Sequence, residues 1–268
     1  MRRLVLLLLS IAVVVSAARV PASASSETPL NACTTENPAF VTDDLSGIQA
    51  PCAAAPGTLL VEMLYFQNAS RVGGTALAAY PLFRLRTGIV HRLEAVIDTP
   101  SQVAESGLHG LGLYPTTHLG YGLNYTFVAD ARLASAIGFE LVPPSSRFNV
   151  NESQPRYVID MTAGFHLMRG VTLSAIATGT SSSNVGFERV NPAAALRLAY
   201  DTSARTQISA DLGARILVRH GAAQNYGDVA VNERLRRNLT FDVGLGTTFN
   251  PVSNAKAHYL ASGFNLHL

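Results

Sequence analysis

The chain has 268 residues, of which 48% are hydrophobic and only 14% are charged, and its formal net charge is +2. An average soluble domain carries about 25% charged residues, so this chain is poor in charge. The near-neutral balance and the lack of a basic stripe argue against a nucleic-acid partner. Beyond the N-terminal region, no stretch approaches the roughly 20 consecutive apolar residues that a membrane helix needs.

The N-terminal region has the order of a secretory signal peptide. The basic "MRR" precedes the apolar run "LVLLLLSIAVVV", and Ala22, Ser23 and Ala24 supply small residues at a cleavage site. The sequence therefore predicts a signal peptide over residues 1–24 and export of the mature chain.

Residues 25–57 are rich in Pro, Ala, Ser and Thr without periodicity, which predicts an irregular mature N-terminal segment. This segment holds both cysteines of the chain, Cys33 and Cys52. An even cysteine count in an exported chain indicates one disulfide, worth about 3 kcal/mol in the chain-entropy model. An alternative interpretation makes Cys33 a lipoprotein acylation site, but the apolar run ends well upstream and Pro, Ser and Glu intervene.

From residue 58 onward, large apolar residues recur at every second position, as they do in amphipathic strands. In "HLGYGLNYTF" (118–127), small or polar residues alternate with a large apolar set, Leu119, Tyr121, Leu123, Tyr125 and Phe127. Glycines inside these segments would cost about 1 kcal/mol each in a helix. The pattern predicts eleven strands, over residues 58–67, 81–87, 92–99, 118–128, 133–142, 157–167, 171–179, 194–201, 206–217, 239–249 and 256–268.

The connections alternate between short polar turns and longer polar loops, which is typical of an up-and-down meander. Long loops are expected near residues 70–79, 100–116, 143–155, 181–193 and 219–237. A periplasmic C-terminus would put the short turn near residues 251–254 outside, where bacterial barrels usually carry long loops. Since single-chain bacterial barrels have even strand numbers, we expect twelve strands.

The same alternation fits a soluble β-sandwich or a transmembrane β-barrel. The barrel is favoured because the polar face is full of Gly, Ser, Thr and charges, which suit a wet lumen better than a core. Segments of ten or more residues match the ~9–11 that a tilted membrane strand needs, whereas globular strands average about five or six. The chain also ends on an alternating segment, "FNLHL", although Leu268 replaces the usual aromatic residue. The expected fold is all-β, an antiparallel up-and-down transmembrane β-barrel over residues 58–268.

Several segments, in order, resemble the outer-membrane family called meta-pathway phenol-degradation-like, a group assigned to transport. The matching pieces include "NPAF", "PGTLLVEMLY", "PLFRLRTGIVHRLEAVIDTP" and "FDVGLGTTF", and the resemblance covers about residues 38–268. It implies a barrel of the bacterial outer membrane that passes small solutes, and it implies no catalytic residues. The two cysteines are not part of the family pattern.

Alternation places a set of charged residues on the polar face of the expected strands. Such rings tune ion or solute selectivity in a pore; alternatively, paired charges fill and rigidify a narrow lumen. The mixed signs predict no strong anion or cation selectivity. The candidate lumen residues are Glu62, Arg84, Arg86, Arg92, Glu94, Asp98, Glu140, Asp160, Arg197, Asp211, Arg215 and Asp242.

Arg84 and Arg86 stand two residues apart on one expected strand and therefore share a face. Acids on neighbouring strands, Glu62 and Glu94 among them, are placed to neutralise the two arginines. We hypothesise that the arginine pair lies at a constriction of the lumen.

The pattern and the resemblance together predict a channel or transporter for small solutes, hydrophobic or aromatic ones included, that works by passive diffusion. A structural or surface-interaction barrel with a plugged lumen is the alternative, and an outer-membrane lipid hydrolase is a less favoured third. The histidines are scattered without metal-ligand spacing, so we expect no metal. No P-loop, paired-carboxylate glycosidase pattern or motif around a Ser–His pair is present, so we expect no cofactor and no enzymatic activity. The expected partners are the lipid bilayer, a small-molecule solute and the barrel-assembly machinery.

Overall fold

The computed structural model describes residue 33 and residues 49–70, 76–99, 102–107, 110–115, 119–143, 155–181, 190–217, 222–250 and 255–268. The expected signal peptide lies outside the described residues. The regular elements within them are all strands. No helix in this part of the chain is long and apolar enough to cross a membrane.

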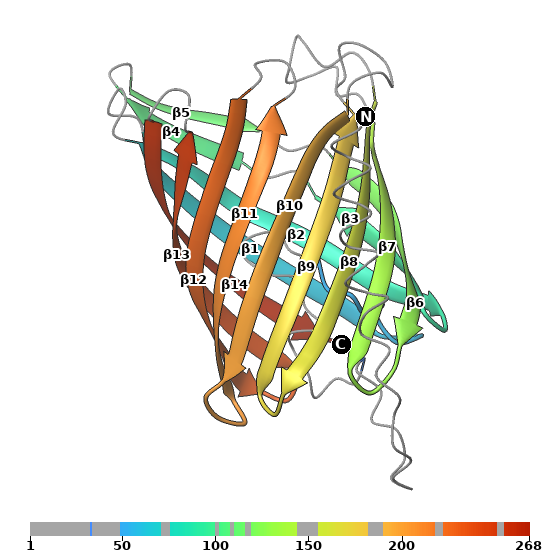
Figure 1. The fold of residues 1–268 in the computed structure, drawn as a ribbon. Helices are drawn as coiled ribbons and strands as arrows, with labels where there is room; N and C mark the ends of the chain where they lie inside the picture. Colours follow the sequence, from blue (N-terminus) through green and yellow to red (C-terminus); the bar gives the residue numbers. More distant parts are fainter. Residues whose placement is uncertain are drawn as a thin grey trace, which may run out of the picture.

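The described residues form one fourteen-stranded sheet, and twelve of its strands close into an antiparallel barrel (Figure 1). The barrel strands are β1 (Leu59–Ser70), β2 (Ala76–Val90), β3 (Leu93–Asp98), β6 (Gly120–Ala129), β7 (Leu133–Val142), β8 (Arg156–Met168), β9 (Val171–Ser181), β10 (Val190–Asp201), β11 (Thr206–Leu217), β12 (Ala222–Arg236), β13 (Leu239–Asn250) and β14 (Ala255–His267). β1 closes the barrel, because Leu60 lies opposite His267 of β14 on one side and Arg86 of β2 on the other. The predicted twelve-stranded fold is confirmed.

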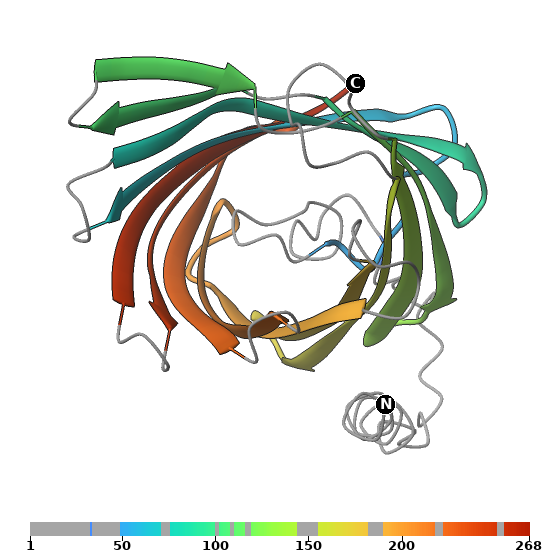
Figure 2. The same ribbon diagram turned by 90° about the horizontal axis from the view of Figure 1, so that it is seen from above.

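The remaining two strands, β4 (Gln102–Gly107) and β5 (Gly110–Pro115), form a hairpin beside the barrel rim, outside the ring (Figures 1 and 2). β4 continues the line of β3, since β2 pairs with β3 near Arg84 and with β4 near Tyr80. The loop predicted over residues 100–116 is therefore wrong. Proline has no backbone N–H to donate to a ladder, so a proline in a segment argues against a strand there. The prolines at positions 100 and 115 lie at the ends of this hairpin, and the two strands were therefore not predicted.

A second loop, predicted over residues 219–237, is also wrong, because β12 runs through most of it. β12 pairs with β11 and β13 along its length. Its outward face carries Val229, Val231 and Leu235, but polar residues at both ends of the segment obscured the alternation. β12 is the twelfth strand that even numbering requires.

Adding β12 shows which connections share an end of the barrel. Five short turns join β2 to β3, β6 to β7, β8 to β9, β10 to β11 and β12 to β13 (bottom of Figure 1). Leu59 and Leu268 lie at the same end, which we call the short-turn end, and their backbones are hydrogen-bonded to each other. β13 and β14 are joined at the opposite end. Only four residues separate β13 from β14 at the end opposite Leu268, so the twelfth strand does not remove the conflict over sidedness.

The strand "HLGYGLNYTF" shows how the two faces of the wall are used. Tyr121, Leu123 and Tyr125 are nearly half exposed on the outer surface, whereas Asn124 and Thr126 are buried inside. An apolar outer surface and a polar interior are the arrangement that a bilayer requires of a barrel wall. The usual inward placement of large apolar residues is inverted.

A charge on the outer face is therefore expected to destabilise the barrel in a membrane. Leu123→Arg should lower the free energy of unfolding in lipid vesicles by up to about 2–4 kcal/mol, because arginine would replace an apolar side chain near the middle of a strand. Urea titration of the vesicle-inserted protein, followed by circular dichroism, measures this change. Ala131→Arg, in the exposed turn after β6, is the matched control and should be nearly neutral. Equal losses in both variants would contradict the assignment of the outer face.

Candidate functional site

The inner wall of the barrel carries charged side chains that are almost fully buried. Arg86, Glu94 and Asp211 are each at most 1% exposed, whereas Leu212, the next residue after Asp211 on the outer face, is 71% exposed. Burying a charge is costly unless the charge is paired and hydrogen-bonded. The partners of these groups therefore determine how the interior is organised.

Residues 49–58, which precede β1, lie inside the ring of strands and are named here the lumen segment (blue in Figure 2). Ala50, Cys52 and Ala54 are buried. Cys52 forms the predicted disulfide with Cys33, and it packs against Ala134 of β7. The segment expected to be merely irregular is thus part of the barrel interior at the short-turn end.

Backbone groups of the lumen segment are bound by side chains of the wall. The N–H of Ala54 donates to Glu94 Oε2 at 2.6 Å, and the N–H of Ala53 donates to Thr126 Oγ1 at 2.7 Å. The Thr126 hydroxyl also donates to the carbonyl oxygen of Pro51 at 3.3 Å. A chain without regular structure needs such partners, because unsatisfied buried backbone groups are costly.

Arg86 stands at the centre of this contact. Its guanidinium donates to Glu94 through Nε at 3.0 Å and through Nη2 at 3.1 Å, and to Glu62 Oε1 through Nη1 at 3.1 Å. Nη2 also donates to the carbonyl oxygen of Cys52 at 2.9 Å. Asn124 Nδ2 completes the cluster by donating to Glu94 Oε1 at 3.1 Å. One arginine therefore joins three strands and the lumen segment, and we call this group the Arg86 cluster.

Gly88 is the point where the lumen segment approaches β2 most closely. A side-chain carbon at this position would overlap the backbone of Ala54 and Ala55. Pro56 forms a parallel bridge to Gly88, and the N–H of Gly57 donates to the Gly88 carbonyl at 3.4 Å. Glycine is needed here because only a residue without a side chain allows this contact.

Gly88→Ala is expected to displace the lumen segment from the wall while the barrel stays closed. The added methyl group meets backbone atoms, which cannot rotate away as a side chain can. Faster limited proteolysis within residues 49–58 of the folded protein would show the displacement. Gly227→Ala is the control, because its added carbon would meet chiefly a terminal carbon of Leu212 at 3.1 Å. Unchanged proteolysis of the Gly88 variant would contradict the tight docking of the segment.

A second cluster surrounds Arg84, further along the same face of β2. Arg84 binds Asp98 in a bidentate manner, with Nε to Oδ1 at 2.7 Å and Nη2 to Oδ2 at 2.8 Å. Glu140 of β7 lies 3.6 Å from the same Nη2. Arg84 and Arg86 thus share a face, as expected from their spacing, but they pair with different acids.

A third cluster lies on the wall formed by β10 to β14. Arg197 binds Asp211 through Nε at 3.0 Å and Nη2 at 3.3 Å. Nearby strands contribute two further carboxylates, each bonded to a neutral donor. The hydroxyl of Tyr259 donates to Asp228 at 2.5 Å, and Asn265 Nδ2 donates to Asp242 at 2.5 Å. The ring of Tyr259 lies over Gly246, its partner across the ladder.

The structure brings most of the predicted lumen residues into these clusters. Asp160 is also buried in the wall, on β8. Arg92 lies in the turn between β2 and β3, with a φ of 68°, and not within a strand. Arg215 belongs to β11, and its side chain lies outside the described part of the structure. Asp228 is not among the predicted lumen residues, because the sequence predicted a loop where β12 runs.

In each of the three clusters an arginine is paired with at least one carboxylate. Among the described residues, no group of three His, Cys, Asp or Glu side chains is arranged to hold a metal ion. The described interior contains paired arginines and carboxylates along the wall, with a backbone segment bound to them at the short-turn end.

No family model matches the chain, and no curated protein matches it in sequence. Solved structures do match. An outer membrane channel from Pseudomonas putida F1 has a TM-score of 0.58 at 16% identity, covering 81% of this chain and 97% of that one. The KdgM porin in complex with disordered oligogalacturonate has a TM-score of 0.50 at 9% identity, covering 77% and 98%. The NanC porin has a TM-score of 0.50 at 8% identity, also covering 77% and 98%. At these identities the likeness shows the fold, which is the barrel of outer-membrane porins and channels.

Proposed function

We propose that this chain is a channel of the bacterial outer membrane through which small solutes diffuse. The observation that carries the proposal is the closed barrel with an apolar outer surface and a charged, polar interior. The outer surface suits a lipid bilayer, and the interior suits water and solute. The proposal includes export by the signal peptide of residues 1–24 and insertion by the barrel-assembly machinery.

The lumen segment narrows the path at the short-turn end, so the proposed channel admits small solutes only. The resemblance to the meta-pathway phenol-degradation-like family supports hydrophobic or aromatic compounds among them, and we propose membership of that family. The paired charges of the Arg84 and Arg86 clusters support the constriction hypothesis. Because each arginine faces carboxylates, strong selectivity for one sign of ion is not expected at this point.

Reconstitution of the mature protein tests the proposal. In planar bilayers we expect small, stable conductance steps, and in liposomes we expect swelling with small neutral or aromatic solutes. Heat-modifiable migration on gels confirms that the protein is folded before it is used. A folded protein that gives neither current nor swelling would contradict passage.

One observation favours a second function, a surface barrel that does not transport. The lumen segment and its disulfide occupy part of the interior, as a plug would. Such a barrel would give no current in the wild type, and the same bilayer experiment therefore separates the two functions. A lipid hydrolase is not proposed; lipase and deacylase assays on the purified protein should give no activity above background.

A further inference from the structure

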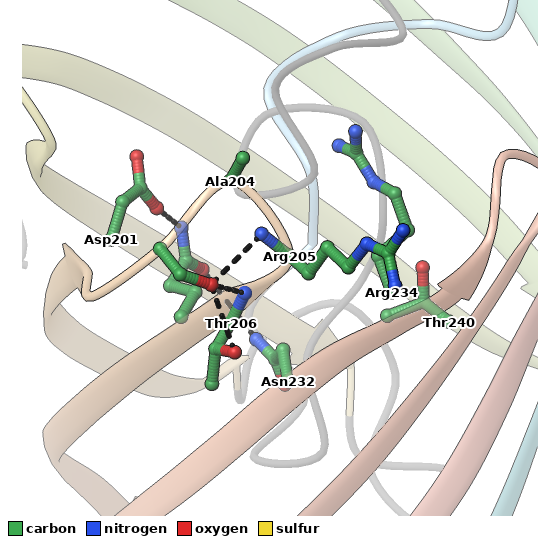
Figure 3. Close-up of a pocket in the computed structure, with 9 residues that line it drawn as sticks. Asp201, Ala204, Arg205, Thr206, Asn232, Arg234 and Thr240 are labelled. Carbon is green, nitrogen blue, oxygen red and sulfur yellow. Dashed lines mark hydrogen bonds between the residues drawn. The ribbon is translucent and has the colours of Figure 1, made fainter.

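A cavity of about 310 Å³ lies at the short-turn end, where the turn between β10 and β11 meets β12 and β13 (Figure 3). This cavity is separate from the Arg86 cluster and contains none of the predicted lumen residues. Its lining residues are Asp201, Ser203, Ala204, Arg205, Thr206, Gln207, Asn232, Arg234 and Thr240.

Two arginines and one carboxylate are the charged groups of this lining. Figure 3 shows Asp201 on one side of the cavity and Arg205 and Arg234 on the other. Asp201 already accepts a hydrogen bond from Gln207 Nε2 at 2.7 Å. The lining itself therefore has an excess of one positive charge, and its acid is engaged by an amide. The carboxylate of Glu233, beside the lining, accepts from the hydroxyl of Thr206 at 2.6 Å.

The backbone holds the two arginines next to each other. The N–H of Arg234 in β12 donates to the carbonyl oxygen of Arg205 in the β10–β11 turn at 2.8 Å, so the two residues are neighbours. The turn itself is fixed by Ser203, whose Oγ accepts from the N–H groups of Arg205 at 3.0 Å and Thr206 at 2.9 Å. A site with ordered backbone loses little entropy when a ligand binds.

We propose that this cavity binds a small oxyanion, either a carboxylate or a phosphate. A guanidinium presents its N–H groups as a planar fork that matches two oxygens of such a group. The neutral side chains of Thr240 and Asn232 line the same cavity and supply further polar contacts. The volume lies at the lower end of the range for small-ligand pockets, which fits a small organic anion.

All five short turns carry an arginine, and this arrangement adds to the attraction of anions toward the cavity. The turn residues are Arg92, Arg132, Arg169, Arg205 and Arg237. Asp130 and Asp201 lie at the same end, but the five arginines outnumber them, and an excess of one sign raises the local concentration of the opposite ion. Specific binding must therefore be separated from this general attraction, and Arg237, exposed and outside the cavity lining, provides the comparison.

Calorimetric titration of the folded protein in neutral detergent tests the proposal. The probes are benzoate, inorganic phosphate and benzamide, which has the shape of benzoate without its charge. We expect binding of benzoate, of phosphate or of both, and no binding of benzamide. Binding of benzoate alone identifies a carboxylate site, and binding of phosphate alone identifies a phosphate site. No binding by either anion, or equal binding of benzamide, would overturn the proposal.

Variants locate the site. Arg234→Gln and Arg205→Gln should each weaken anion binding about 10-fold or more, because each removes one charge-assisted contact. Arg237→Gln should leave the affinity within about twofold, since Arg237 does not line the cavity. Equal weakening by all three variants would show general attraction and reject the site. Arg205 lies in an exposed turn, so its variant keeps the test valid where Arg234→Gln does not fold. The experiment needs no transport, so its outcome is independent of whether the barrel conducts.

Discussion

Arg86→Leu is expected to lower the free energy of unfolding by about 3–5 kcal/mol, the cost of breaking a buried ion pair from one side. The substitution leaves Glu94 at 0% exposure and Glu62 at 7% exposure without their arginine. It also removes the donor to the carbonyl oxygen of Cys52, which holds the lumen segment. The loss should appear as a lower urea midpoint in vesicles, followed by circular dichroism.

Arg84→Leu is the matched control for this prediction. Arg84 lies two residues away on the same face of β2, but its side chain is 22% exposed and its partner Asp98 is 19% exposed. Water can partly solvate Asp98 once Arg84 is gone, so the loss should be clearly smaller than for Arg86. A double variant, Arg86→Leu with Glu94→Gln, should recover part of the stability by removing one stranded charge. If Arg84→Leu and Arg86→Leu lower the free energy of unfolding equally, burial does not determine how much the Arg86 cluster stabilises the barrel.

Deleting residues 25–57 is expected to raise the single-channel conductance several-fold. The lumen segment occupies space inside the barrel and is bound to the wall through Glu94, Thr126 and Arg86. Without it, the short-turn end is wider and the Arg86 cluster faces water. Bilayer recordings of the folded deletion variant, beside the wild type, measure the change.

A double variant, Cys33→Ser with Cys52→Ser, distinguishes the effect of the lumen segment's presence in the barrel from the effect of its disulfide. It keeps the segment and its hydrogen bonds but removes the disulfide. Its conductance should stay near that of the wild type, with more frequent transitions between levels as the segment loosens. If the deletion variant conducts no more than the wild type, the lumen segment does not limit passage.

Glu94 takes part in both predictions, the stability loss of Arg86→Leu and the conductance gain on deleting residues 25–57. One of its carboxylate oxygens accepts both from Arg86 and from the N–H of Ala54, so the wall and the segment share an acceptor. The free energy of unfolding and the single-channel conductance are therefore both expected to depend on Glu94. Variants that loosen the segment should also lower the urea midpoint, although by less than Arg86→Leu does.

Much of the fold could be predicted from local pattern. Alternation along "HLGYGLNYTF" placed Leu123 and Asn124 on opposite faces, because side chains point to opposite faces at successive positions of any strand. The barrel favoured by strand length and by the polar face then put Leu123 outward and Asn124 inward. The prediction failed where alternation is weak or interrupted, at β4, β5 and β12. There, pairing with neighbouring strands supplies the stabilisation that local sequence does not show.

The sequence by itself determined the all-β class and which residues of each strand share a face, because both follow from a periodicity that a single chain displays. It also predicted the barrel and the pairing of Cys33 with Cys52, which the structure contains. Only the tertiary structure decided that residues 49–58 enter the barrel and that Arg86 binds them while Arg84 binds Asp98. The same structure brought Arg205 and Arg234 together around one cavity. These contacts join residues from different strands, and their geometry depends on register, curvature and burial, which arise only once the sheet has closed.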